Sequence, residues 1–215
     1  MMGRLFMRDD QEVGPLMEKM MRGEGMEFHL GAKILEVAQN DGSGVVRIEK
    51  EKKILDIPFD ALLVALGRGA VTDELGLNDA GIAVDKRGYI KTNDRQQTSV
   101  PGIYACGDVC GPYQFTHMAG YQAGIVLRNI IFKFPARVDY SAVPWVTYTR
   151  PEVAHAGYTE EAAKGKGLLG DSLLCDLAEN DRARTEGDAP GFIKIVTDRK
   201  GRLIGTTIVG RKAGE

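Results

Sequence analysis

The sequence predicts an α/β protein whose last third changes to an α+β pattern. Residues 60–66 (DALLVAL) and 103–106 (IYAC) are short apolar runs, as expected of strands that are covered on both faces. A buried helix is predicted from His117 to about Lys133, because apolar residues surround most of its circumference. Beyond a boundary at residues 134–142, short strands alternate with turns, which is typical of an antiparallel sheet.

The first predicted element is a helix that runs to about Arg22. Asp9 or Asp10 can cap it, because a carboxylate accepts hydrogen bonds from the first helical amides. Pro15 lacks an amide hydrogen and fits best in a first turn, so a start nearer Gly14 is the alternative.

Short strands are predicted between this helix and the first apolar run. The turn signal NDGSG at residues 40–44 indicates a hairpin. The charge run at residues 49–53 is interpreted as a solvated hairpin tip. The predicted strands are residues 26–30, 32–39, 45–50 and 53–57.

After the first apolar run, a hairpin is predicted around the turn Asp85 to Gly88. In the last third, Thr159 is expected to cap a short helix, with two glutamates in its first turn. The predicted strands there are residues 143–148, 153–158, 173–177, 192–197 and 203–209.

Composition excludes several classes of protein. The chain has 28 Lys plus Arg and 30 Asp plus Glu, for a net charge of −2, so no nucleic-acid-binding footprint is expected. No apolar run is long enough to span a bilayer or to form a signal-peptide core, so no membrane contact is expected. Three cysteines argue against a disulfide scaffold and predict a reducing, cytoplasmic environment.

The candidate ligand site centres on Gly107 and Asp108, which end the second apolar run. A glycine lets a ligand approach the backbone, and a carboxylate accepts hydrogen bonds from sugar-type hydroxyls. Open α/β sheets bind ligands at the carboxyl ends of their strands. A plain turn aspartate is the alternative interpretation, and the flanking residues decide against it.

Two neighbouring segments extend this site. Thr116 is predicted to cap the buried helix, so the amides of His117, Met118 and Ala119 would present positive partial charge to an anionic ligand atom. Gly67 and Arg68 follow the first apolar run and suggest a second ligand edge; a plain strand-to-loop turn is the alternative there.

Other motifs carry little chemistry. A formal G-x-G-x-x-G at Gly165, Gly167 and Gly170 follows a helix and precedes a strand, the reverse of the phosphate-binding arrangement, so it is interpreted as a loop. Cys106 and Cys110 are interpreted as a core thiol and a loop thiol, and Cys175 as a core thiol. No histidine spacing resembles a metal site, and no catalytic set is recognisable.

Several segments, in this order, resemble the flavin-dependent pyridine nucleotide–disulfide oxidoreductases. They are ALGR at 65–68, DELGLNDAGI at 73–82, TSVPGIYACGD at 98–108, PWVTYTRPEVAHAGYTE at 144–160, NDRARTEG at 180–187, GFIKIV at 191–196 and GRLIGTTIVG at 201–210. The resemblance covers almost the whole chain and is strongest to the mercuric reductase and dihydrolipoamide dehydrogenase branch.

The resemblance implies an internal fragment with incomplete Rossmann-like parts and part of an antiparallel dimerisation domain. Residues 1–66 would be the later part of an NAD(P)-binding domain, residues 67–134 the second segment of an FAD-binding domain, and residues 135–215 the first part of the interface domain. The family's FAD-binding glycine motif, C-x4-C pair, nicotinamide-nucleotide motif and His-x4-Glu pair are absent from this sequence, and Ala70-Val71 replaces the family's Pro-Asn.

The resemblance also implies cofactors and roles. Asp108 would bind the ribityl hydroxyls of FAD, the amides of His117, Met118 and Ala119 would face the flavin pyrimidine edge, and Gly67 and Arg68 would lie near the NAD(P)H path. The whole protein would pass electrons from NAD(P)H through FAD to a cysteine pair, and on to a small-molecule disulfide or Hg(II).

These 215 residues alone are expected to be inactive and to retain FAD weakly or not at all. They are also expected to self-associate, as a homodimer or otherwise. The alternative interpretation is a non-catalytic structural or dimerisation module.

Overall fold

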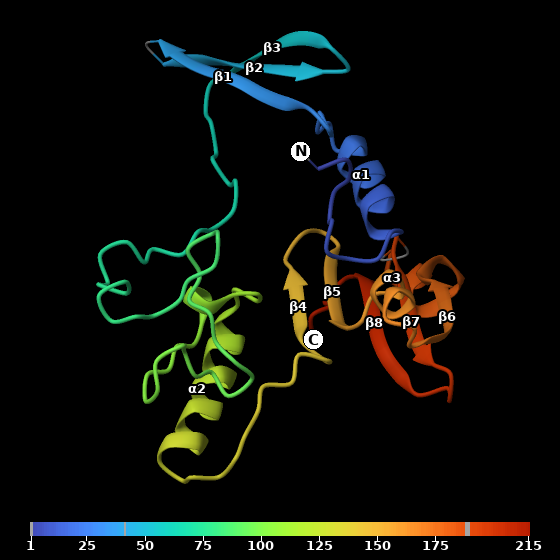
Figure 1. Ribbon diagram of the computed structural model, residues 1–215. Coiled ribbons are helices and arrows are strands. Elements are labelled where there is room, and N and C mark those ends of the chain that lie inside the picture. Colours follow the sequence, from blue (N-terminus) through green and yellow to red (C-terminus); the bar gives the residue numbers. More distant parts are fainter. Residues whose placement is uncertain (1, 41, 188–189) are drawn as a thin grey trace. The chain divides into compact units, whose positions relative to one another are not determined.

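The computed structural model describes residues 2–40, 42–187 and 190–215. Two compact units make up the chain. One combines residues up to 65 with residues 144–215, and the other contains residues 66–143. Each unit is described by itself (Figure 1). The domain boundaries inferred from the sequence remain a prediction.

The first unit begins with a helix, α1 (Val13–Gly23). Glu12 precedes it and provides no side-chain cap, so the prediction of an Asp9 or Asp10 cap is wrong: both carboxylates bond to distant partners instead. The start at Val13 places Pro15 in the first turn, where its missing amide hydrogen costs nothing, as the alternative prediction required.

A three-stranded antiparallel meander follows, formed by β1 (Lys33–Asn40), β2 (Ser43–Lys50) and β3 (Lys53–Phe59) in the order β1-β2-β3. Both predicted hairpins are confirmed, including the charged tip at Glu51 and Lys52, although Asp41 of the first turn lies outside the described residues. The predicted strand at residues 26–30 is wrong, because these residues pair with no neighbour among those described.

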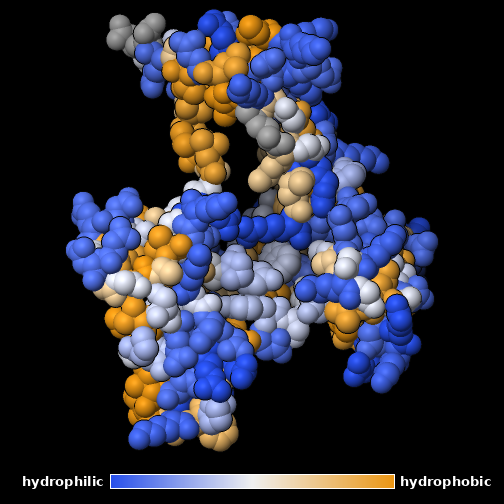
Figure 2. Space-filling view, viewed as in Figure 1, coloured by the Kyte–Doolittle hydropathy of each residue, from blue (hydrophilic) through white to orange (hydrophobic). Residues whose placement is uncertain are grey.

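Apolar side chains lie exposed on this meander. Figure 2 shows them as an orange area over the three-stranded sheet. The exposed members are Ile34, Leu35, Val37, Ile54 and Leu55, each at least 41% exposed. Such exposed side chains are open to contact with other apolar surfaces.

A five-stranded antiparallel sheet forms the rest of this unit, in the order β4-β5-β8-β7-β6. The predicted strands are confirmed, and Thr159 caps α3 as expected by accepting a hydrogen bond from the Ala162 amide at 3.2 Å. A further short helix, α4, was not predicted. The bounds are β4 Pro144–Thr147, β5 Glu152–Gly157, α3 Glu160–Gly165, β6 Leu169–Asp176, α4 Asp181–Glu186, β7 Phe192–Asp198 and β8 Leu203–Gly210.

One face of α1 packs against this sheet and forms the main core. Periodicity explains the contact: positions 13 and 17 are four apart on the helix, and alternate residues of each strand face the same side. The core residues, all at most 5% exposed, are Val13, Met17, Val153, Phe192 and Val209.

Strand β6 lies at the edge of the sheet and has only β7 as a neighbour. Leu173 and Leu174 point to opposite faces and are 60% and 50% exposed, so neither face is covered there. Cys175 is exposed as well, and its prediction as a core thiol is wrong for this reason.

The second unit contains α2 (Thr116–Ile130) and irregular loops. Val84 and Ile90 form a single bridge where a hairpin was predicted. Only one face of α2 is covered, by burial of Met118, Gln122 and Ile125, so the prediction of a helix buried all round is wrong. Its opposite face meets solvent, as the 51% exposure of Leu127 shows.

The two apolar runs that predicted buried strands form none. Leu63 and Leu66 are 89% and 81% exposed, and residues 60–66 pair with no strand among the described residues. A strand exists only where a neighbour accepts its backbone hydrogen bonds. In the second run, Tyr104 makes one isolated bridge to Gln97, and the chain otherwise runs as a loop.

Candidate functional site

The Gly107–Asp108 turn is built on α2. Gly107 has a φ of +83°, a conformation that glycine adopts without strain, and a Cβ added there would lie 3.3 Å from the Cβ of Ala119. Its amide donates a 2.6 Å hydrogen bond to Oε1 of Gln122. Gln122 is fully buried, and its Nε2 donates to the hydroxyl of Tyr140 at 2.9 Å. The buried side chain of Gln122 therefore holds the turn in place.

Asp108 projects from this fixed turn towards solvent, at the start of a 3₁₀ turn (Asp108–Cys110). Arg68 Nη1 lies 3.2 Å from Asp108 Oδ2 and also donates to the carbonyl of Gln114 at 3.4 Å. The side chains of Arg68 and Asp108 are 67% and 48% exposed, so their ion pair is weak. A ligand hydroxyl can replace the guanidinium at this carboxylate with little loss.

The two segments predicted to line a ligand, Gly67–Arg68 and Gly107–Asp108, therefore meet at the ion pair of Arg68 with Asp108. The hydroxyl of Tyr89 donates to the carbonyl of Arg68 at 3.0 Å and holds that backbone in place. Gly67 has a φ of +112°, and a Cβ added there would meet no atom within 4 Å. The space beside Gly67 is open.

The start of α2 differs from the prediction. Thr116 is the first helical residue rather than the cap, and Phe115 precedes the helix without a side-chain hydrogen bond. The amides of Met118 and Ala119 donate to the carbonyl of Phe115 at 3.0 and 3.1 Å. These two amides thus have an intrahelical acceptor, which leaves the dipole of the helix end as the feature that could attract an anionic group. The exposed His117 stacks its ring on that of Phe115, with centroids 5.3 Å apart.

The Cys110 thiol is poorly suited to nucleophilic chemistry. Cys106 and Cys110 are both free thiols. Burial, together with the neighbouring Cys106, raises the pKa of the Cys110 thiol to about 11, so it carries no thiolate at neutral pH. The glycine motif at residues 165–170 has the predicted order of helix, loop and strand: Gly165 ends α3, Gly167 lies in the connecting loop and Gly170 already lies in β6.

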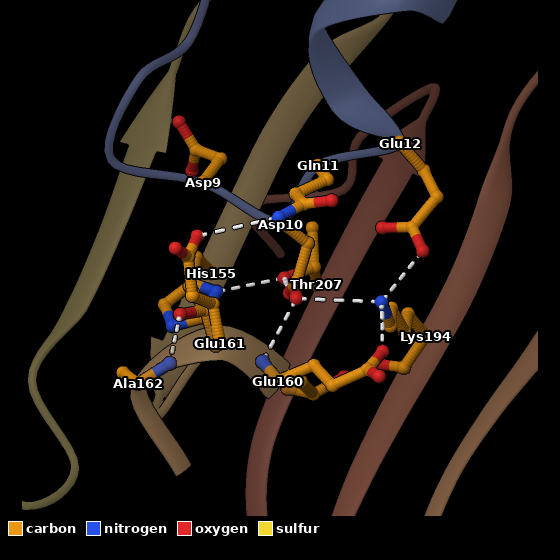
Figure 3. Close-up of polar contacts among 12 residues, drawn as sticks. Asp9, Asp10, Gln11, Glu12, His155, Glu160, Glu161, Ala162, Lys194 and Thr207 are labelled. Atoms are coloured by element: carbon orange, nitrogen blue, oxygen red, sulfur yellow. Dashed lines mark hydrogen bonds and ion pairs between the residues drawn. The ribbon is translucent and has the colours of Figure 1, made fainter. Parts of the chain in front are cut away.

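A second polar site, which the sequence reasoning missed, lies in the first unit. The ammonium of Lys194 is buried, with Nζ 2.7 Å from Glu12 Oε1, 2.6 Å from Glu160 Oε2 and 3.5 Å from Asp10 Oδ1 (Figure 3). Burial alone would lower the pKa of Lys194, but the hydrogen bonds to Glu12 and Glu160 outweigh it and raise that pKa. The hydrogen bond to Lys194 lowers the pKa of Glu160.

One signal in the sequence could have identified this site. Lys194 alternates with Phe192 and Val196 along β7, and period two places all three on the covered face. A lysine in that pattern needs buried carboxylates. Their positions, 34 to 184 residues away along the chain, could not be inferred from spacing.

Among the described residues, no three His, Cys, Asp or Glu side chains lie close enough to hold a metal ion. Within that same part of the chain, no helix is long and apolar enough to cross a bilayer.

The chain matches two models of one protein family and is similar to several known proteins. Residues 1–123 match the family described as pyridine nucleotide-disulphide oxidoreductase, and residues 143–215 match the dimerisation domain of that family. The chain is 36% identical to mitochondrial dihydrolipoyl dehydrogenase of Caenorhabditis elegans and 35% identical to dihydrolipoyl dehydrogenase of Cupriavidus necator. It aligns over 96% of its own length with each and spans only 42% and 44% of theirs.

Solved structures show the same fold. The HOCl-induced flavoprotein disulfide reductase RclA from Escherichia coli superposes with a TM-score of 0.84 at 27% identity, over 99% of this chain and 48% of that one. LpdA from Mycobacterium tuberculosis superposes with a TM-score of 0.85 at 22% identity, over 96% and 45%. The chain therefore combines part of a nucleotide-binding fold with the antiparallel dimerisation sheet, and it belongs to the pyridine nucleotide-disulphide oxidoreductase family.

Proposed function

We propose that this chain is part of a flavin-dependent oxidoreductase. In the whole protein, FAD, when bound, would carry electrons from NAD(P)H towards a cysteine pair and on to a small-molecule disulfide or Hg(II). The observation that carries this proposal is the exposed carboxylate of Asp108 on a rigid turn against α2. The turn fits a flavin: Gly107 is held close to the helix, and the carboxylate has only a weak partner.

Each candidate residue has a distinct part in this proposal. Asp108 accepts hydrogen bonds from the ribityl hydroxyls, and Arg68 leaves the carboxylate as they arrive. The first turn of α2, with His117, Met118 and Ala119, places the positive end of the helix dipole near the flavin edge, where negative charge develops on reduction. Gly67 leaves room along the path of the nicotinamide nucleotide.

A second candidate function is dimerisation without catalysis. The match of residues 143–215 to the family's dimerisation domain and the exposed apolar side chains of the meander favour self-association. We propose a homodimer for both candidates. They differ in flavin binding and in the electron transfer that bound flavin would support.

The purified 215-residue chain is expected to show no NAD(P)H-dependent reduction of lipoamide or Hg(II), because its three thiols include no C-x4-C pair and Cys110 is not ionised. It is also expected to release added FAD during gel filtration. Turnover above the rate of free flavin would contradict the first expectation, and stoichiometric yellow protein the second. A dimer that shows no saturable flavin binding at all would favour the second candidate function.

Replacing Asp108 with alanine is expected to weaken FAD binding by about 1–3 kcal/mol, the usual cost of hydrogen bonds to a charged acceptor. Equilibrium titration of flavin fluorescence measures the change. Asp79→Ala, at an exposed position in the same unit, is the matched control. Equal affinities of the Asp108→Ala and Asp79→Ala variants would mean that Asp108 is only a turn residue.

A further inference from the structure

A chain of three hydrogen bonds, two of them buried and one partly buried, runs beside Lys194. His155 Nε2 lies 3.0 Å from the carbonyl oxygen of Gly157, and His155 Nδ1 lies 2.7 Å from Thr207 Oγ1. Thr207 Oγ1 in turn lies 2.5 Å from Asp10 Oδ2 (Figure 3). The three side chains are at most 3% exposed, so water does not complete these contacts.

Counting protons along this chain gives an imbalance. A carbonyl oxygen only accepts, so Nε2 of His155 must carry a hydrogen. The two contacts of Thr207 need one hydrogen each, and its hydroxyl supplies one. A neutral histidine and an ionised Asp10 would leave two lone pairs facing each other at hydrogen-bond distance. The second hydrogen must sit on His155 Nδ1 or on Asp10 Oδ2.

The charged groups around the chain favour keeping that extra proton. Lys194 Nζ lies 3.5 Å from Asp10 Oδ1 and closer to Glu12 and Glu160, so three carboxylates share one positive charge. Negative groups therefore exceed positive ones in this buried region, and a proton reduces the excess. The groups that face the chain are Asp9, Glu12 and Arg4 from the amino-terminal segment, Glu160 from α3 and Lys194 from β7.

The ring of His155 is held in place by an aromatic neighbour. It stacks on Trp145 of β4, with centroids 4.2 Å apart. Burial lowers the pKa of the His155 imidazole. The negative charges of Asp10 and Asp9 oppose this effect, because they favour the protonated ring.

We propose that Asp10 and His155 bind one additional proton between them through Thr207, and that this proton fastens the segment before α1 to the five-stranded sheet. The proton belongs to the pair rather than to either residue. Asp10 adds a second contact to the fastening, because its Oδ1 accepts the amide of Glu160 at the start of α3 at 2.9 Å.

The proposal sets the sign of a pH dependence. In the unfolded chain the aspartate and the histidine have pKa values of about 3.9 and 6.5, so above roughly pH 7 neither binds the extra proton. The folded pair keeps it, and folding then takes up one proton. The stability from the pair is complete between about pH 4 and 6.5, where the unfolded chain also binds one proton, and it is lost as the pH rises. The unfolding equilibrium constant should increase about tenfold per pH unit above roughly pH 7.

Asp10→Asn tests this directly. The asparagine amide donates permanently to Thr207, and its oxygen still accepts the Glu160 amide. We expect this variant of the 215-residue chain to fold and to lack the pair's pH dependence. The ratio of the unfolding constants, unmodified chain over variant, should grow about tenfold per unit between pH 7 and 8.5. Fluorescence of Trp145, the single tryptophan, follows urea unfolding beside the pair.

Two controls make the result specific. Asp9→Asn changes the neighbouring carboxylate, which accepts from Trp145 Nε1 at 2.9 Å and stands outside the proton chain, so this variant should keep the slope of the unmodified chain. Cys110, whose thiol pKa is raised to about 11, also takes up protons on folding in alkaline solution. All variants retain Cys110, so its contribution cancels in the ratio of the unfolding constants.

A second measurement needs no folded variant. Calorimetric unfolding of the unmodified chain at pH 7.5, in buffers of different ionisation enthalpy, counts the protons released. Release of about one proton supports the shared proton. Release near zero, or parallel pH slopes for the unmodified chain and a folded Asp10→Asn variant, would overturn the proposal.

Discussion

Replacing Lys194 with methionine is expected to lower the free energy of unfolding by about 1–3 kcal/mol, because it leaves the buried carboxylate of Asp10 without its cation. The methionine fits the covered face of β7, beside Phe192 and Val196, so lost packing contributes little. The cost comes from the carboxylates left behind. Asp10 is the most affected, since its side chain is 2% exposed, whereas those of Glu12 and Glu160 are 40% and 37% exposed and can be hydrated. Urea unfolding at pH 7 measures the difference.

The pH dependence identifies the cause of that loss. In the unmodified chain, Lys194 lowers the pKa of Glu160, so Glu160 contributes stability that is present above about pH 4.3 and lost as the pH falls through its folded pKa. The Lys194→Met variant lacks this contribution. The gap between the two proteins should therefore narrow below about pH 4.5.

Lys200→Met, in the exposed turn between β7 and β8, makes the same chemical change without a buried partner. Its effect should stay within about 0.5 kcal/mol. Equal effects of the two substitutions would show that the carboxylates around Lys194 relax into water at no cost, and the network would then contribute nothing to stability.

The sequence predicted best those elements whose signals lie within a few neighbouring residues. The meander, the strands of the last third and the Thr159 cap depend on turn residues and alternation within a few positions, and all are confirmed. The runs at residues 60–66 and 103–106 failed because an apolar run reports burial, while a strand also needs a neighbour. Among the described residues neither run has one beyond the single bridge of Tyr104.

The candidate site could be predicted only in part, for a related reason. Gly107 and Asp108 are adjacent, so their spacing was sufficient to find them. The ion pair between Asp108 and Arg68 joins residues 40 apart, and the hydrogen bond from Gly107 to Gln122 joins residues 15 apart. The contact of Thr207 with Asp10 spans 197 positions. Only folding brings such groups together, and composition and periodicity carry no record of which distant groups meet.

Replacing Met17 with alanine is expected to destabilise the chain by about 2–5 kcal/mol, the usual range for emptying a fully buried methionine site. Met17 is 0% exposed and packs with Val153, Phe192 and Val209. Alanine is a better helix former than methionine, so any loss reports the cavity beneath α1 rather than the helix itself. Denaturant unfolding, followed in parallel by circular dichroism and by Trp145 fluorescence, measures it.

Met26→Ala is the matched control, because Met26 follows α1 and is 49% exposed. Its effect should be within about 0.5 kcal/mol. If Met17→Ala shifts both probes together, α1 and the five-stranded sheet unfold as one cooperative unit. That outcome would mean that residues near both ends of the sequence stabilise each other without help from flavin. A shift below about 1 kcal/mol, or separate transitions for the two probes, would mean that α1 is not anchored to the sheet in solution.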